Sequence, residues 1–303
     1  MNRLEVDRAT FYALLGRAWQ VIAGPITLVL ISMYFPPKMQ GWFYVFAEML
    51  ALQSLVEMNL NQIIINIASH EWSHLKQAPD GSLTGDPEAL SRLVSLGRFF
   101  ANWYLGVAGL YTLVIGVGGG FWMASNASSP EIDWLGPWIV VTICTGLSLW
   151  FIPIYALLNG CNQVIATHRF RVVQGILGNL AVWSCIPLGA GLWTTVAIAA
   201  TKLAGDIFPL LGPYRRFFRV FFQKPQGPTV SWQDEIAPLQ WRLALQTGSS
   251  ALAMSSLTLV LFDYHGEAAA GRMGMTWSAL KSLQWGALAW VYTRVPKFGM
   301  LIA

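Results

Sequence analysis

Long apolar runs alternate with shorter polar gaps along this chain of 303 residues. Roughly eight of the runs reach the length of a membrane crossing: 11–35, 42–67, 99–124, 136–160, 171–190, 191–211, 240–262 and 273–293. A hydrocarbon core about 30 Å thick requires about 20 apolar residues of an α-helix that rises ~1.5 Å per residue. The pattern therefore predicts an all-α integral membrane protein, a polytopic helix bundle of about eight transmembrane helices.

Basic residues are concentrated in alternate gaps. Fifteen of the 19 Lys and Arg residues fall on one predicted side of the bilayer: Arg3, Arg8, Arg17, Lys76, Arg92, Arg98, Arg169, Arg171, Arg215, Arg216, Arg219, Lys224, Arg242, Arg294 and Lys297. The other side has only Lys38 and Arg272, while Lys202 and Lys281 lie inside runs. Because cytoplasmic loops carry the excess of Lys and Arg, we expect both termini to be cytoplasmic.

Composition agrees with this interpretation, since 55% of the residues are hydrophobic and only 11% are charged, against about 25% charged in ordinary soluble domains. The net charge of +4 follows from the same cytoplasmic bias, so we expect no nucleic-acid partner. Cys144, Cys161 and Cys185 lack metal-type spacing and are interpreted as packing residues. No cofactor is expected.

Two gaps suggest how the chain is organised. Asp86, Pro87 and Glu88 combine an N-cap, a proline at the first helical position and an acid in the first turn, which predicts a short helix leading into the third run. A Pro- and Gly-rich stretch follows the sixth run. We therefore expect an N-terminal six-helix lobe over 1–222, a cytoplasmic linker over 223–239 and the first two helices of a second, incomplete lobe over 240–303.

Charged residues at membrane depth need a reason, because each costs at least ~2.5 kcal/mol at a helix centre. Lys202 and Asp206 are four residues apart on one helical face. They either neutralise each other or form a relay that couples transport to an ion. Lys281 has no acid on its own run, so it binds either an anionic ligand or a partner on another helix.

Polar residues also mark the first two runs. Gln53, Glu57 and Asn61 recur every four residues and form a slowly drifting stripe, which faces either a wet cavity or another helix. Arg17, with Gln20 one turn later, lies about two turns inside the first run. Its guanidinium either extends to the interface or binds a phosphate group.

The segment His70-Glu71-Trp72-Ser73-His74 matches the His-Glu-x-x-His pattern of zinc hydrolases, in which two His bind zinc and the Glu activates water. A third ligand is required, and His168 is the only other His on the same predicted side. We interpret the segment as the amphipathic end of the second helix, and we expect no metal site.

Several segments resemble bacterial polysaccharide-biosynthesis membrane proteins related to O-antigen flippases, in the superfamily that includes multidrug and toxin extrusion transporters. The segments are Gly16-Arg17-Ala18-Trp19-Gln20, Gln40-Gly41-Trp42-Phe43-Tyr44-Val45-Phe46, Ala68-Ser69-His70-Glu71, Leu158-Asn159-Gly160-Cys161, Gln240-Trp241-Arg242-Leu243-Ala244, Gly271-Arg272-Met273-Gly274-Met275 and 295–303. The resemblance implies two six-helix lobes around a central cavity. Family members continue past the last segment for several helices, so we expect a second lobe that is about one third present.

The resemblance implies a flippase for lipid-linked oligosaccharide, carried on a polyprenyl pyrophosphate, in the bacterial inner membrane, and no enzyme activity. Arg17 and Lys281 would contact the anionic headgroup, and Gln20 is a further candidate for substrate binding. Gln53, Glu57 and Asn61 would hydrate sugars. Lys202 and Asp206 would tune charge or couple to an ion gradient. The lipid bilayer and polysaccharide-assembly proteins are the other expected partners. The alternatives are a drug or cation exporter of the same superfamily and a non-transporting subunit of a polysaccharide-assembly complex, and truncation would impair transport.

Overall fold

The structure, a computed structural model, describes residues 3–57, 60–78, 83–126, 131–232 and 236–302, with side chains at most of these positions. The described chain is helical apart from one small sheet. Its helices are α1 (Arg3–Tyr34), α2 (Pro37–Ala51), α3 (Gln53–Glu57), α4 (Leu60–Trp72), α5 (Pro87–Tyr111), the π-helical η1 (Thr112–Gly118), α6 (Gly119–Asn126), α7 (Leu135–Trp150), α8 (Ile152–Gly160), α9 (Val164–Cys185), α10 (Trp193–Leu211), α11 (Arg215–Arg219), the 3₁₀ turn η2 (Val220–Phe222), α12 (Ala237–His265) and α13 (Glu267–Ile302). Strands β1 (Leu75–Gln77) and β2 (Leu83–Gly85) form an antiparallel pair. The predicted all-α fold class is confirmed.

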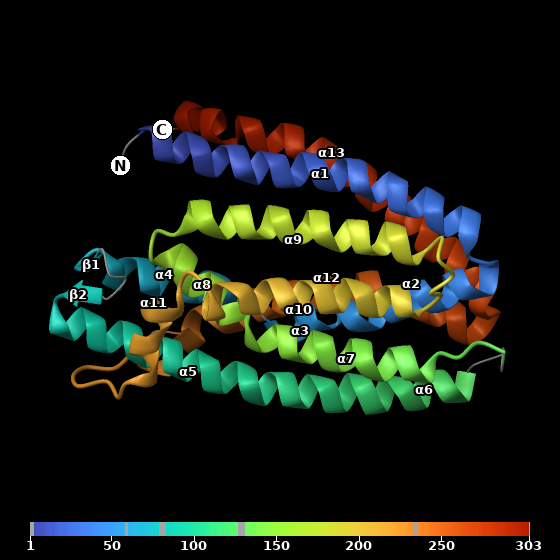
Figure 1. The fold of residues 1–303 in the computed structure, drawn as a ribbon, viewed down its shortest axis with the longest axis horizontal. Coiled ribbons are helices and arrows are strands. Elements are labelled where there is room, and N and C mark those ends of the chain that lie inside the picture. The colour runs from blue at the N-terminus through green and yellow to red at the C-terminus, as the bar shows by residue number, and fades with distance from the viewer. Residues whose placement is uncertain (1–2, 58–59, 79–82, 127–130, 233–235, 303) are drawn as a thin grey trace.

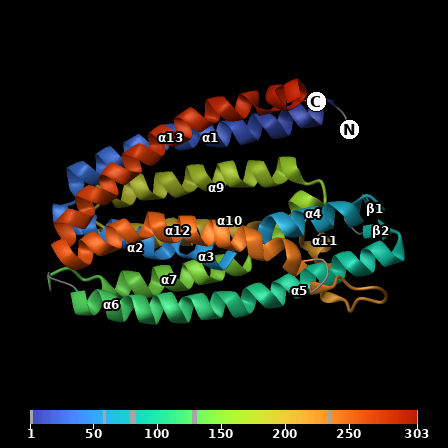
Figure 2. The ribbon, with the colours of Figure 1, turned by 180° about the vertical axis from the view of Figure 1, so that it is seen from behind.

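The long helices lie along one common axis and form an elongated bundle (Figure 1). One end of the bundle holds both termini, the β1–β2 pair and α11. The C-terminal ends of α1, α6, α9 and α12 lie at the opposite end, as the reverse view also shows (Figure 2). The gaps rich in Lys and Arg are thus gathered at one end of the molecule.

Local sequence signals determine where several helices begin and end. Pro36 and Pro37 separate α1 from α2, and Gly266 adopts a φ of 78° between α12 and α13. The predicted cap before α5 is present, because the Glu88 N–H donates to Asp86 Oδ1 at 3.1 Å. The short helix expected after this cap is instead continuous with the third run, since nothing in 87–111 interrupts the helical pattern.

Among the described residues, four helical segments are long and apolar enough to cross a membrane: Arg8–Tyr34, Pro87–Asn126, Leu135–Gly160 and Trp193–Leu211. They correspond to the predicted runs 11–35, 99–124, 136–160 and 191–211. The prediction of eight transmembrane helices is not supported. The runs 42–67, 171–190, 240–262 and 273–293 are largely helical but do not qualify among the described residues.

Polar residues explain why two of the four runs that do not qualify, 42–67 and 171–190, differ from the membrane-length segments. Within 42–67, α2 ends at Ala51 and α3 carries Gln53 and Glu57, so the helix is interrupted where its sequence is polar. The run 171–190 begins at Arg171 and contains Gln174. Each such residue lowers the mean apolarity of its helix below that of a membrane crossing.

The buried apolar residues form two main clusters. One lies toward the cation-rich end and includes Ile64 of α4, together with Phe100, Leu158 and Phe217. The other includes Trp42, Phe46, Trp138 and Phe262 and joins α2, α7 and α12. Helices α12 and α13 pack against α1, α2 and α3, so the residues of the predicted second lobe lie against the first. The division into two lobes stays a prediction.

Candidate functional site

A cavity of about 490 Å³ between α1 and α9 gathers three basic side chains. Arg17 comes from α1, and His168 and Arg171 come from α9. Gln20 and Asn179 add amide groups to the same wall. The described lining contains no acidic side chain, so the cavity is suited to an anion.

Helical spacing explains why these side chains meet. Arg17 and Gln20 are three residues apart on α1, as His168 and Arg171 are on α9, and residues at this spacing share a helix face. Gly16 allows the two helices to approach closely, because a Cβ at this position would lie 3.2 Å from Val172 Cγ2. The cavity therefore lies between one face of α1 and one face of α9, which come into contact at Gly16.

Burial and charge act together on His168. Desolvation, followed by the nearby charge of Arg17, lowers the pKa of His168 from its ordinary value of 6.5. The imidazole is consequently neutral at neutral pH. An anion in the cavity would favour the imidazolium, so His168 can add a third positive charge when a ligand is bound.

A second cavity, of about 300 Å³, continues along α1. It shares Gln20 and Asn179 with the first cavity and reaches Ser278 and Ser282 of α13. Along α1, basic side chains line the first cavity, and neutral hydrogen-bonding groups line the second cavity. This gradation suits a ligand with a charged group and an attached polar portion.

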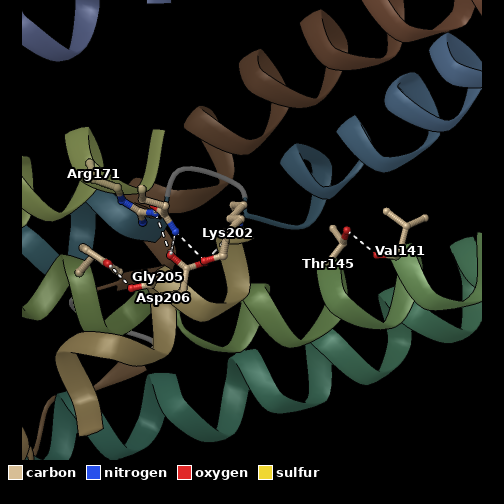
Figure 3. Close-up of polar contacts among 8 residues, drawn as sticks. Val141, Thr145, Arg171, Lys202, Gly205 and Asp206 are labelled. Atoms are coloured by element: carbon tan, nitrogen blue, oxygen red, sulfur yellow. Dashed lines mark hydrogen bonds and ion pairs between the residues drawn. The ribbon is translucent and has the colours of Figure 1, made fainter. Parts of the chain in front are cut away.

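A charge network lies beside the first cavity (Figure 3). The Asp206 carboxylate, which is 2% exposed, accepts hydrogen bonds from Arg171 Nη1 at 2.8 Å and Lys202 Nζ at 3.4 Å. Gln174 Nε2 donates to the same carboxylate at 3.1 Å. The predicted contact between Lys202 and Asp206 is present, but Arg171 is the closer partner.

Arg171 links this network to the cavity. Its guanidinium carbon lies 3.8 Å from the centre of the Tyr155 ring, a cation–π contact, and the Tyr155 hydroxyl donates to the Gly205 carbonyl at 2.9 Å. Sequence patterns identified Arg171 only as a basic residue of a gap. The one signal for a role in a polar site was its position at the start of a run that also contains Gln174.

The predicted stripe of Gln53, Glu57 and Asn61 is divided between two helices. Gln53 and Glu57 lie on α3, where Glu57 is within electrostatic range of Lys202 and Arg171. Gln53 Oε1 is buried without a hydrogen-bond partner among the described residues. Asn61 lies on α4 and is exposed. The structure therefore brings Glu57 toward the charge network and does not place the three residues on one continuous helix.

Lys281 has a partner from another helix. Its ammonium lies 3.4 Å from Glu48 Oε1 of α2 and 5.7 Å from the centre of the Trp277 ring. Glu48 has an 8% exposed side chain. Of the two alternatives for Lys281, pairing across helices is the one that the structure contains.

Glu71 of the His-Glu-x-x-His segment connects two helices. Its Oε1 accepts a hydrogen bond from Arg92 Nε of α5 at 2.7 Å, and its side chain is 5% exposed. His70 and His74 have ring centres 6.2 Å apart, whereas His168 lines the cavity on α9. Over the described ranges, no three His, Cys, Asp or Glu residues are grouped as metal ligands.

The fold and this site define a helical-bundle protein whose described part contains four helical segments of membrane-crossing character and a cationic cavity. Comparison with known protein families, curated proteins and solved structures finds no match to this chain.

Proposed function

We propose that this protein translocates a lipid-linked oligosaccharide across the bacterial inner membrane and that the cavity between α1 and α9 receives its pyrophosphate. The observation that carries the proposal is the convergence of Arg17, His168 and Arg171 on one cavity in a protein with four membrane-length helices. Arginine binds phosphate oxygens through paired N–H groups. A charged headgroup needs such a lining, because the hydrocarbon core of the bilayer offers it no partners.

The outer surface supports a membrane location. Met33, Leu113 and Phe121 are 71%, 64% and 75% exposed, respectively, and they belong to a large set of exposed apolar side chains on α1, η1 and α6. Soluble monomers rarely expose contiguous apolar area of this kind. The cation-rich end is assigned to the cytoplasm, with both termini there, because Lys and Arg accumulate on that side.

The second cavity would accommodate the sugars. Gln20, Asn179, Ser278 and Ser282 supply donors and acceptors to hydroxyl groups without adding charge. Asp206 would hold Arg171 in place beside the cavity through the ion pair with its guanidinium. Lys281 is assigned to the contact with Glu48 in place of headgroup binding.

A cation exporter of the same superfamily is disfavoured by the site. Two arginines in one cavity repel a cationic drug, and Asp206 is already paired with Arg171 and Lys202. A non-transporting subunit of an assembly complex would have no need of a cavity between α1 and α9 that is lined by cations and amides.

Liposomes that contain the purified chain and a fluorescent lipid-linked sugar test the proposal. A membrane-impermeant quencher reports how fast the label moves between leaflets. We expect movement with the wild-type protein and a loss of about tenfold or more in Arg17→Gln, because a charge-assisted contact contributes about 1.5–3 kcal/mol. Arg8→Gln is the matched control, since Arg8 is exposed on the same helix and lies outside the cavity lining.

Two results would count against different parts of the proposal. If the wild-type chain moves the label no faster than protein-free liposomes, transport is refuted. If the wild-type chain moves it and Arg17→Gln does so equally fast, the cavity is not the headgroup site.

A further inference from the structure

A third cavity, separate from the two that line α1, lies between α5, α8 and the α11–η2 segment. It encloses about 300 Å³, at the lower end of the range for small-molecule sites. Its wall is mainly apolar and includes Leu105, Trp150, Leu157, Phe218, Phe221 and Phe222. We call this cavity the α5–α11 groove.

The sequence makes room for this groove at one glycine. A Cβ at Gly97 would overlap Cδ1 of Phe221, so only glycine allows the ring to pack against α5 there. Trp150 lies at the opening, 38% exposed, and its indole N–H donates to the Ala101 carbonyl at 3.0 Å. The indole is thereby held in a fixed orientation along the apolar wall.

Positive charge lies at the cytoplasmic end of the groove. Arg98 lines the groove, and its Nη1 donates to the Gln223 carbonyl at 2.8 Å and to the Phe222 carbonyl at 3.5 Å. A guanidinium has five N–H donors, so these contacts leave donors for a further partner. Helix α11 adds Arg215 and Arg219, both exposed, while it buries Phe217 and Phe218. Such a short basic, amphipathic segment is typical of the membrane interface.

We propose that the α5–α11 groove binds an anionic phospholipid of the cytoplasmic leaflet, with one acyl chain along Leu157 and Trp150 and the phosphate at Arg98. Charge complementarity identifies this occupant. The apolar wall accepts a hydrocarbon chain, and the basic residues at one end favour a negative over a zwitterionic headgroup. Figure 1 shows α11 beside α5 at the cation-rich end, where a headgroup of that leaflet would lie. This inference does not depend on the proposed transport activity.

Trp150 provides the measurement. The delipidated full-length protein is mixed, in detergent, with phosphatidylglycerol or phosphatidylcholine whose acyl chains carry bromine, which quenches nearby indole fluorescence. The signal of Trp150 is the difference between the wild type and Trp150→Phe. We expect phosphatidylglycerol to quench this signal at a mole fraction about fivefold lower than phosphatidylcholine, the preference that one interfacial cation supplies.

Variants separate the charge from the groove. Arg98→Gln should remove the preference and Arg98→Lys should retain it, because the lysine keeps the charge even if the contact to Gln223 is lost. Arg169→Gln, at an exposed cation of the same end outside the groove, should match the wild type. Ala101→Leu narrows the groove without changing a charge and should weaken quenching by both lipids. Equal quenching by the two lipids, no quenching of Trp150, or an unchanged preference in Arg98→Gln would overturn the proposal.

Discussion

Asp206 is the acid that accepts hydrogen bonds from the polar side chains between α9 and α10. It is 2% exposed, and it lies between Arg171 and Lys202, whose side chains are 42% and 41% exposed. The carboxylate therefore depends on the two cations for its stabilisation, because it is buried and they are partly exposed. Glu57, within electrostatic range of both cations, supplies a second acid to the same network.

Replacing Asp206 should destabilise the protein more than replacing either cation. For Asp206→Asn we expect a loss of about 2 kcal/mol, below the ~3–5 kcal/mol of a fully buried broken pair, because the remaining cations are only partly buried. Lys202→Met should cost less than about 0.5 kcal/mol, since Arg171 keeps its shorter contact. Thermal unfolding of the purified protein in detergent provides the measurement. An equal loss in Lys202→Met and Asp206→Asn would show that Arg171 is not the main partner.

His168 should make stability depend on pH. Because the pKa of His168 in the folded protein is lowered from 6.5, the unfolded chain binds a proton more readily than the folded one. The contribution is therefore fully present above about pH 6.5 and is lost as the pH falls below that value. Unfolding temperatures of the wild type should fall between pH 7.5 and 5.5 by more than those of His168→Gln. Identical falls in both proteins would contradict this expectation.

The same residue should report on ligand binding. Pyrophosphate in the cavity would favour the imidazolium, so its affinity should rise as the pH falls below about 6.5. Titration of the detergent-solubilised protein with pyrophosphate at pH 7.5 and 6.0 measures this change. The rise should disappear in His168→Gln, whereas an equal rise in that variant would assign it to another group.

At the scale of elements, the contact between α2 and α13 is set by glycines. A Cβ at Gly41 would overlap the Glu267 carbonyl oxygen, and a Cβ at Gly271 would lie 2.9 Å from the Gly41 nitrogen. The backbones of the two helices are thus in direct contact. Trp42 strengthens the junction, because its indole N–H donates to Glu267 Oε1 at 3.2 Å.

A single methyl group at Gly41 should therefore separate these helices. We expect Gly41→Ala to lower the free energy of unfolding by about 3 kcal/mol, the upper part of the range for overpacking, because the obstructing atom belongs to the backbone. Gly106→Ala on α5 is the matched control, since no atom lies within 4 Å of its added Cβ. It should be neutral or stabilising by up to about 1 kcal/mol through helix propensity. Similar unfolding temperatures for the two variants would contradict the close contact.

Sequence patterns predicted contacts within one helix better than contacts between different helices. The cap at Asp86 and the spacing of Lys202 and Asp206 involve neighbours in the chain, so local rules found them. The pairs of Arg171 with Asp206 and of Lys281 with Glu48 join residues 35 and 233 positions apart. Such pairs depend on which helices pack together, and the periodicity of the sequence does not predict that packing. The eight-helix count failed for a different reason, because polar residues interrupt some of the runs or lower their apolarity below that of a membrane crossing.

At the scale of the molecule, the distribution of Lys and Arg and the arrangement of the helices define the same two ends. The β1–β2 pair, α11 and both termini share one end, and the connection between α9 and α10 lies at the other (Figure 2). Gly189 and Gly191 make that connection short by adopting φ values of 76° and 57°. Helix α10, one of the four membrane-length segments, joins it to the cation-rich end.

The orientation can be tested with two cysteines on either side of α10. In a background that lacks Cys144, Cys161 and Cys185, one variant carries Leu188→Cys, where the native side chain is 82% exposed, and another carries Gln226→Cys, which is also exposed. Because cytoplasmic segments carry the excess of Lys and Arg, a membrane-impermeant maleimide should label position 188 in intact cells and label position 226 only after lysis. The reverse pattern would invert the protein in the bilayer. Labelling of both positions in intact cells would mean that α10 does not cross it, and the transport proposal would then fail with the topology.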